Sequence, residues 1–176
     1  MFQEARGSRR PLPVAPRPFP LEAFGPWIGR MASCYRMSVP EFDRQMGLGL
    51  KCLSGGVGWL RLPPQSVQTL ENLGDLARLE PAALRAIEIP EPWARRRKRC
   101  LYCPRCVFLN PEDVGSPYWK RRWLDPAVAS CEVHATPLRA IPCAKVRRCL
   151  NLAQLLSQVS RYEREVTSGM LRPILR

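Results

Sequence analysis

The sequence predicts a mainly α-helical protein with a small metal-binding module near its C-terminal end. Three observations predict this fold class. Apolar residues recur with a helical period within residues 21–90, two pairs of residues with metal-ligand spacing lie within residues 93–149, and leucines recur with a helical period after residue 150. We therefore expect a helical domain, a small module of strands and loops, and a final helix.

The first expected helix lies near the start of this helical region. Its apolar residues fall at i, i+4, i+7 and i+11 and share one face: Phe24, Ile28, Met31 and Tyr35. Trp27 and Arg30 fall outside this series, so we expect them on a face that is partly exposed. Such a face would be available to a partner.

A second helix is predicted directly after the first one. Ser38-Val39-Pro40-Glu41 is a capping box with proline in the first turn, and Gly47 ends the helix. Two short helices joined by such a turn are a helix-turn-helix candidate. Residues 65–73 predict a third helix, and Glu80-Pro81 opens a fourth.

Four residues of the following module predict a metal site: Cys103, Cys106, Cys131 and His134. They form Cys-Pro-Arg-Cys, then twenty-four residues, then Cys-Glu-Val-His. Two such pairs on tight turns supply the four soft and borderline donors that a tetrahedral structural zinc ion requires. The chain has only one histidine, and it falls three positions after a cysteine. We therefore predict one Zn²⁺ ion in a zinc-ribbon-like Cys3His zinc finger.

Cys100 leaves alternatives open for this site. Cys100 and Cys103 have the same spacing as Cys103 and Cys106. We favour the second pair because Pro104 pre-sets a turn, whereas Cys100 falls on a strand that enters the turn. The cysteines could instead hold an iron–sulfur cluster, although the Cys-x-x-His pair favours zinc. Free or disulfide-bonded thiols are the remaining alternative.

Charge points to a nucleic-acid partner. The chain has 28 Lys and Arg against 15 Asp and Glu, a net charge of +13, and residues 93–148 alone carry 13 basic and 4 acidic side chains. Arginine suits bidentate contacts to phosphate, although a solvated basic surface is the alternative interpretation. We predict nucleic-acid contacts from Arg95, Arg96, Arg97, Lys98, Arg99, Lys120, Arg121 and Arg122.

Eight cysteines could also indicate a secreted disulfide scaffold. Residues 1–20, however, contain five prolines and four arginines and lack the apolar stretch of a signal peptide. No apolar run reaches the length of a membrane span. We therefore expect a cytoplasmic protein without membrane contact.

These signals divide the chain into four parts. Residues 1–20 predict a disordered or extended tail, 21–92 a helix-turn-helix-like domain, 93–149 the zinc module, and 150–176 a C-terminal helix and tail. The aromatic residues between the two ligand pairs are expected in the core of the module, with base stacking as the alternative. These residues are Tyr118, Trp119 and Trp123.

Taken in order, these segments resemble the TniQ family of transposition accessory proteins over about residues 19–149. Three segments carry the resemblance: Leu21-Glu22-Ala23-Phe24-Gly25-Pro26-Trp27-Ile28-Gly29-Arg30-Met31-Ala32, then Tyr102-Cys103-Pro104-Arg105-Cys106, and Tyr118-Trp119-Lys120-Arg121-Arg122-Trp123 with Cys131-Glu132-Val133-His134. The chain is short, like the small single-module members. The second zinc knuckle that is frequent in the family is reduced here to Cys143 and Cys149, which we expect to be free thiols.

The resemblance implies an adaptor for target-site selection in transposons with a DDE-type transposase. One surface would contact an AAA+ ATPase regulator of the TnsC/TniB type, and another would contact DNA or a CRISPR effector with its guide RNA. A stand-alone zinc-containing transcriptional regulator is the alternative function. We expect no enzymatic activity and no small-molecule substrate, because His134 is assigned to the metal and the carboxylates are scattered without a motif.

Overall fold

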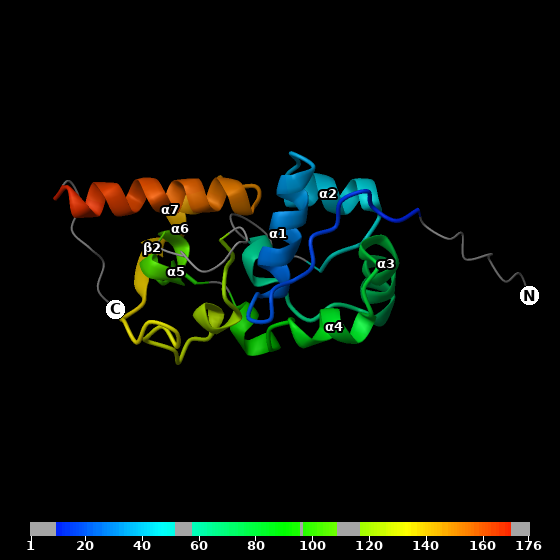
Figure 1. Ribbon diagram of the computed structural model, residues 1–176, viewed down its shortest axis with the longest axis horizontal. Coiled ribbons are helices and arrows are strands. Elements are labelled where there is room, and N and C mark those ends of the chain that lie inside the picture. Colours follow the sequence, from blue (N-terminus) through cyan, green and yellow to red (C-terminus); the bar gives the residue numbers. More distant parts are fainter. Residues whose placement is uncertain (1–9, 52–57, 96, 109–116, 170–176) are drawn as a thin grey trace, which may run out of the picture.

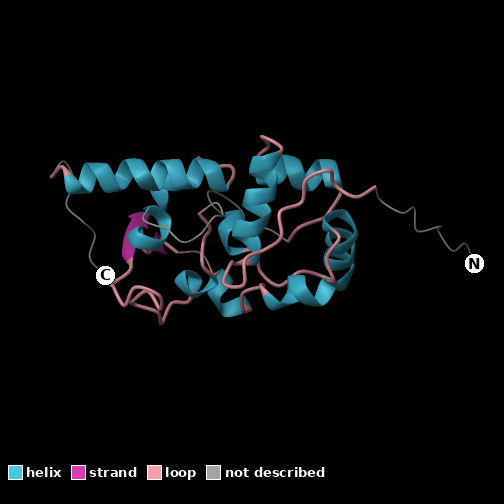
Figure 2. Ribbon diagram, viewed as in Figure 1, coloured by secondary structure: helices cyan, strands magenta, loops and turns pink. Residues whose placement is uncertain are grey.

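The structure is a computed structural model that describes residues 10–51, 58–95, 97–108 and 117–169. Within these ranges the chain forms seven α-helices and one two-stranded sheet, which confirms the mainly helical fold class (Figure 2). The molecule is elongated. Helices α1 to α4 occupy one half, the sheet lies in the other half, and α7 runs along one side (Figure 1).

The elements follow the predicted order. The first half contains α1 (Phe24–Cys34), α2 (Val39–Met46), α3 (Val67–Ala77) and α4 (Pro81–Ala86). The second half contains β1 (Arg99–Tyr102), α5 (Pro104–Phe108), β2 (Arg139–Pro142), α6 (Cys143–Val146) and α7 (Leu152–Thr167). Short 3-10 helices connect them: η1 (Gly58–Arg61), η2 (Glu91–Ala94) and η3 (Arg121–Leu124).

Local sequence signals set the ends of α2. The Ser38 hydroxyl accepts a hydrogen bond of 3.2 Å from the Glu41 backbone N–H, and the Glu41 carboxylate accepts one of 2.8 Å from the Ser38 backbone N–H. The predicted capping box is therefore present. Gly47 ends the helix in the left-handed conformation with φ 57°. Helices α1 and α2 are joined by residues 35–38, and a DNA-reading role for this pair stays a prediction.

Helix α1 is buried over most of its length because two glycines let η1 approach its backbone. A Cβ atom at Gly25 would lie 2.1 Å from the carbonyl oxygen of Trp59, and one at Gly29 would lie 2.5 Å from the Trp59 ring. The indole N–H of Trp59 donates a hydrogen bond of 3.0 Å to the carbonyl oxygen of Cys149, so the same residue ties α1 to the chain just before α7.

This close approach predicts that Gly25→Ala destabilises the protein. Replacing a glycine inside a helix by alanine normally raises the free energy of unfolding by roughly 0.5–1 kcal/mol. Overpacking a buried contact lowers it by about 1–3 kcal/mol. We expect a net loss of stability in denaturant unfolding. Gln45→Ala, at an exposed position of α2, is the matched control and should be close to neutral. A Gly25→Ala protein as stable as the control would contradict the close packing of η1 on α1.

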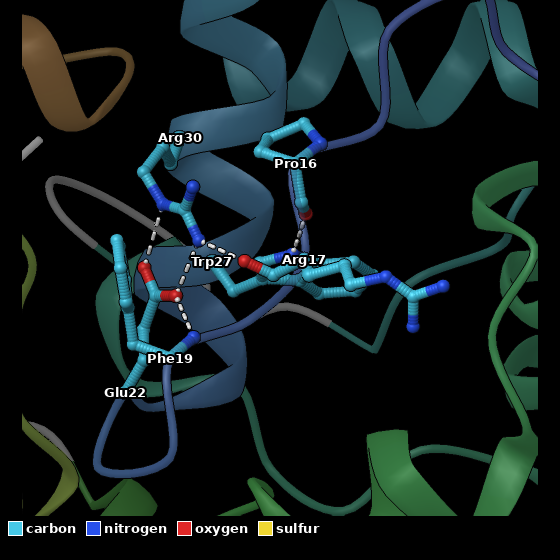
Figure 3. Close-up of polar contacts among 6 residues, drawn as sticks. All are labelled: Pro16, Arg17, Phe19, Glu22, Trp27 and Arg30. Atoms are coloured by element: carbon cyan, nitrogen blue, oxygen red, sulfur yellow. Dashed lines mark hydrogen bonds and ion pairs between the residues drawn. The ribbon is translucent and has the colours of Figure 1, made fainter. Parts of the chain in front are cut away.

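The prediction of a partly exposed face on α1 is wrong for Trp27 but not for Arg30. Trp27 is fully buried, and its indole N–H donates a hydrogen bond of 2.8 Å to the carbonyl oxygen of Pro16 (Figure 3). The Arg30 guanidinium forms an ion pair of 2.7 Å with the fully buried Glu22 and lies 4.6 Å from the centre of the Phe19 ring. Trp27 therefore offers no surface to a partner, whereas the Arg30 side chain, although held by these contacts, keeps 11% of its surface exposed.

These contacts also fix part of the predicted tail. The backbone N–H of Leu12 donates to the carbonyl oxygen of Leu76 at 2.9 Å, and Arg30 donates to that of Arg17 at 2.7 Å. Residues 10–20 thus form an extended segment that packs on the helices, which agrees with the extended alternative. Residues 1–9 lie outside the described part of the chain.

The buried ion pair predicts a pH-dependent effect of Arg30→Met. Burial raises the pKa of the Glu22 carboxyl above its ordinary value of 4.5, and the hydrogen bond and charge of Arg30 offset part of this shift. Removing Arg30 would leave a buried carboxylate unpaired at pH 7, at a cost of about 3–5 kcal/mol. Below the ordinary pKa, Glu22 is protonated and needs no cationic partner, so the penalty should shrink as the pH falls through the raised pKa.

Denaturant unfolding of Arg30→Met at pH 7 and at about pH 4 would measure this difference. Arg17→Met, which removes an exposed arginine of the same region, corrects for the general effect of pH on stability. If Arg30→Met lowers the free energy of unfolding equally at both pH values, Arg30 does not act by stabilising the ionised form of Glu22.

Helix α7 joins the two halves of the molecule. Two residues just before α7 bond to the segment around the start of α2. The Leu150 carbonyl oxygen accepts a hydrogen bond of 2.8 Å from the Val39 N–H, and the Asn151 side-chain amide donates one of 2.9 Å to the Met37 carbonyl oxygen. Further along the helix, Glu163 accepts a hydrogen bond from the buried Tyr102 hydroxyl of β1. Buried apolar residues form one continuous core across both halves. The predicted division of the chain into separate units at residues 20, 92 and 149 stays a prediction.

The predicted final helix is confirmed by α7, whose apolar face packs inward through Leu152, Leu155 and Val159. Among the described residues, none of the helices combines the length and the apolar character needed to cross a membrane.

Candidate metal centre and basic surface

The two-stranded sheet positions the two predicted ligand pairs. Strand β1 leads directly into Cys103, and β2 begins five residues after His134. The strands pair antiparallel, with Tyr102 opposite Arg139 and Cys100 opposite Ile141. Because the chain enters the first pair from β1 and leaves the second pair toward β2, this pairing brings the two segments to the same end of the sheet.

Each pair lies on a tight backbone turn. In the first, Pro104 begins α5, and the Val107 N–H donates to the Cys103 carbonyl oxygen at 3.1 Å. In the second, the Ala135 N–H donates to the Cys131 carbonyl oxygen at 2.9 Å, and the Cys131 N–H donates to the Thr136 carbonyl oxygen at 2.8 Å. Ala135 adopts φ 49°, which lets the chain reverse immediately after the histidine.

The structure brings the four predicted ligands together in what we call the Cys3His cluster: Cys103, Cys106, Cys131 and His134. Their ligand atoms all lie within 4.8 Å of one another. The Nδ1 atom of His134 is 3.6 Å from the Cys103 sulfur, 3.3 Å from that of Cys106 and 3.7 Å from that of Cys131. The sulfurs of Cys106 and Cys131 are 3.6 Å apart.

These distances fit a tetrahedral ion. Bonds of about 2.3 Å to sulfur and about 2.0–2.1 Å to nitrogen give tetrahedral edges of roughly 3.5–3.8 Å. The four separations given above fall close to this range, and all six lie within 4.8 Å. The cluster could therefore hold a metal ion, with Nδ1 of His134 as the nitrogen ligand.

The thiols of the cluster differ in how readily they lose their protons. Burial, followed by the neighbouring Cys131 thiol, raises the pKa of Cys106 to about 12. Burial also acts to raise the pKa of Cys131, but the backbone N–H groups of His134 and Val133 and the neighbouring thiols outweigh it and lower that pKa. Two backbone donors thus stabilise one thiolate, and a divalent cation would displace the remaining thiol protons.

Cys100 is not part of the Cys3His cluster. It is fully buried on β1, and its sulfur lies 3.3 Å from that of Cys143 and 3.9 Å from the Arg61 guanidinium. Of the alternatives left open by the sequence, the structure therefore favours Cys103 with Cys106 as the first pair. Cys143 and Cys149 lie outside the Cys3His cluster as well, and their expected state as free thiols stays a prediction.

Of the three aromatic residues predicted to lie in the core of the module, the two tryptophans do so. Trp119 is fully buried and Trp123 is 2% exposed, and their rings meet edge to face at 5.5 Å between centroids. Tyr118, which is half-buried, stacks on Phe19 at 4.4 Å. Base stacking by the two tryptophans is excluded by this burial.

One supporting residue of the metal module was not predicted. Glu163 of α7 accepts hydrogen bonds from the Tyr102 hydroxyl and from the Arg139 guanidinium, and so fixes both strands beside the Cys3His cluster. The contact joins residues 61 positions apart in the sequence. No spacing rule in the sequence connects these residues. The one available signal is that Glu163, a charged residue, lies next to Tyr162 on the side of α7 that is buried.

The first group of predicted nucleic-acid residues remains largely accessible. Arg95, Lys98 and Arg99 are exposed and Arg97 is half-buried, while Arg96 lies outside the described residues. These cations lie on the segment that runs from the end of η2 to the first residue of β1. They are therefore placed where a polyanion could contact them.

The second group has structural contacts. Lys120 is 6% exposed and its ammonium lies 5.8 Å from the centre of the Tyr118 ring. Arg121 donates to the Ala86 carbonyl oxygen at 2.9 Å. Arg122 forms ion pairs of 3.5 Å with Asp125 and 4.0 Å with Glu132. Because of these contacts, the three cations of the second group do not form one exposed basic patch with the first group.

The Cys3His cluster predicts that Cys103→Ser loses a bound metal ion and much of its stability. Metal binding contributes directly to folding in small modules of this kind. We expect about one ion per chain in the unsubstituted protein and a fall in Tm of at least about 10 °C in the variant, since each kcal/mol shifts Tm by roughly 2–4 °C at this chain length. Elemental analysis and thermal unfolding measure both quantities.

Three matched variants test the specificity of this effect. Cys34→Ser changes an exposed cysteine outside the cluster, and Cys143→Ser and Cys149→Ser change the other thiols near the module. All three should keep the ion. A metal content that is equally low in Cys103→Ser and Cys34→Ser, or an unchanged melting curve after treatment with a strong chelator, would contradict the site.

Comparison with known proteins places the chain in a family. The TniQ family profile matches residues 13–138, which include α1, the segment Tyr118–Trp123 and the complete Cys3His cluster. No curated protein and no solved structure gave a significant match. The family consists of non-catalytic accessory proteins of DNA transposition. Because the match covers well over half of the sequence, the chain belongs to the TniQ family.

Proposed function

We propose that the protein is a non-enzymatic adaptor in DNA transposition. It links an AAA+ ATPase regulator of transposition to the component that recognises the target site, which is either DNA itself or an RNA-guided effector. The observation that carries this proposal is the family match over residues 13–138. It gives the chain a transposition-associated role, and the adaptor mechanism is the extension that we propose.

The metal chemistry supports a structural role for the Cys3His cluster. All four positions of a tetrahedron are supplied by protein side chains, so no position is left for a water molecule or a substrate. Three thiolates with one imidazole suit Zn²⁺. We therefore propose one zinc ion that stabilises the module, and elemental analysis that found iron instead would contradict this assignment.

Accessible cations beside the metal module support the nucleic-acid contact of the adaptor. We propose that five cations contact phosphate groups of the target component: Arg95, Arg96, Arg97, Lys98 and Arg99. Lys120 and Arg121 have weaker support, because the first is buried and the second is bonded to a backbone carbonyl group.

A reconstituted integration reaction tests the adaptor proposal. It would contain the transposase, the AAA+ ATPase, donor and target DNA, and the targeting component where the element uses one. We expect targeted insertion to fall to background when this protein is left out. Adding Cys34→Ser should restore it, whereas Cys103→Ser should not, because the metal module would be unfolded.

Targeted insertion at an unchanged frequency without this protein would overturn the adaptor proposal. In that case the alternative, a stand-alone transcriptional regulator, would gain support. Sequence-specific binding of the purified protein to a promoter fragment would then be the measurement that follows.

A further inference from the structure

A basic groove that the sequence did not single out lies between α6 and α7. It has a volume of about 810 Å³. Four cations line it, from α6, from the turn that follows and from the middle of α7: Lys145, Arg147, Arg148 and Arg161. We call this surface the α6–α7 groove. None of the predicted cations of residues 95–99 lines it, although the Lys98 carbonyl oxygen accepts a hydrogen bond of 2.8 Å from the Cys143 N–H at the start of α6.

The charges of the α6–α7 groove are not neutralised within the fold. All four cationic side chains are exposed, and no carboxylate lines the groove. Within the described ranges, none of the four cations forms an ion pair with a carboxylate, and Arg161 donates a hydrogen bond to Gln158. Four like charges around one depression repel one another, so an anion would be attracted to it.

The neutral lining of the groove is also suited to phosphate. Besides the cations, it presents side-chain amides and a hydroxyl group, which are common partners of phosphate oxygens. These are Gln154, Ser157 and Gln158. The first turn of α7 also lines the groove, but the N–H groups of Ala153 and Gln154 are already bonded to Ser33 and Asn151. The side chains are therefore the groups that would contact a ligand.

The lining further indicates which form of nucleic acid fits. Proteins that bind single strands combine cations with aromatic side chains on which unpaired bases stack. No aromatic residue lines the α6–α7 groove. A duplex keeps its bases stacked inside and presents only phosphates and sugars to such a surface. The chemistry therefore favours a duplex backbone.

We propose that the α6–α7 groove binds the sugar–phosphate backbone of a nucleic-acid duplex through Lys145, Arg147, Arg148 and Arg161. The contact is independent of base sequence, because phosphate contacts position a protein and carry no sequence information of their own. The inference deepens the proposed function in one respect, since it makes the adaptor itself hold the duplex at the target site.

Binding of purified full-length protein to a duplex, measured over a range of salt concentrations, tests the groove. The groove variant carries Lys145→Gln, Arg147→Gln, Arg148→Gln and Arg161→Gln. Each lost contact to duplex DNA should reduce the slope of log affinity against log salt by about 0.9. We expect a reduction of roughly 2–4 in this slope and a loss of affinity of at least about tenfold at physiological salt.

The control variant removes the same charges from exposed positions in the other half of the molecule. It carries Arg10→Gln, Arg17→Gln, Arg44→Gln and Lys51→Gln, which are again three arginines and one lysine. We expect its slope to change by less than about 1. A third variant, with Arg95, Arg97, Lys98 and Arg99 changed to Gln, compares the groove with the cations before β1. Equal effects of the groove and control variants would show that only net charge matters and would overturn the proposal.

Competitors of equal length identify the form of the ligand. Duplex DNA and duplex RNA share the phosphate chemistry, and the one that competes better is the source of the ligand. Single-stranded DNA that competes better than both duplexes would overturn the assignment. These measurements need no transposition partner, so failure of the groove leaves the integration test of the adaptor unaffected. Normal metal content and Tm of each variant ensure that a loss of binding reflects the groove.

Discussion

The convergence of two short turns on one point is the constraint on which the metal module depends. Cys103 with Cys106 and Cys131 with His134 come from segments that share no helix or strand, yet their ligand atoms lie within 4.8 Å of one another. The sheet of two four-residue strands that connects them is too small to be stable alone. A bound ion would supply the missing free energy, and burial of the strands against α7 supplies the rest of the geometry.

Helix α7 and the segment before α1 extend this constraint to the whole molecule. Glu163 of α7 bonds to Tyr102 and Arg139 on the two strands, while the start of the same helix bonds to the region of α1 and α2. On the other side, the N–H of Ala23 donates to the carbonyl oxygen of Trp119 at 3.2 Å. A change in the metal module would therefore be felt in the helical half, and a partner bound to either half meets a connected structure.

The distribution of charge separates structural cations from available ones. Arg30, Lys120 and Arg121 are used inside the fold, in an ion pair with Glu22, over the Tyr118 ring and on the Ala86 carbonyl group. Exposed cations lie among residues 95–99 and around the α6–α7 groove, and further ones, such as Arg17, Arg44 and Lys51, are scattered over the other half of the molecule. A net charge of +13 thus does not describe a uniform surface. It describes a few places where an anion can approach without displacing an internal partner.

The sequence by itself determined the features that depend on local spacing. The capping box at Ser38, the helical faces around Phe24 and Leu155 and the two Cys-x-x-ligand turns follow from residues a few positions apart, because helix caps and metal knuckles are short-range structures. Tertiary packing alone decided the rest. Trp27 and the 10–20 segment bury each other, Glu163 reaches strands 24 and 61 residues away, and Lys145 comes to lie beside Arg161, since contacts between distant segments are set by how the helices pack and leave no periodic signal in the sequence.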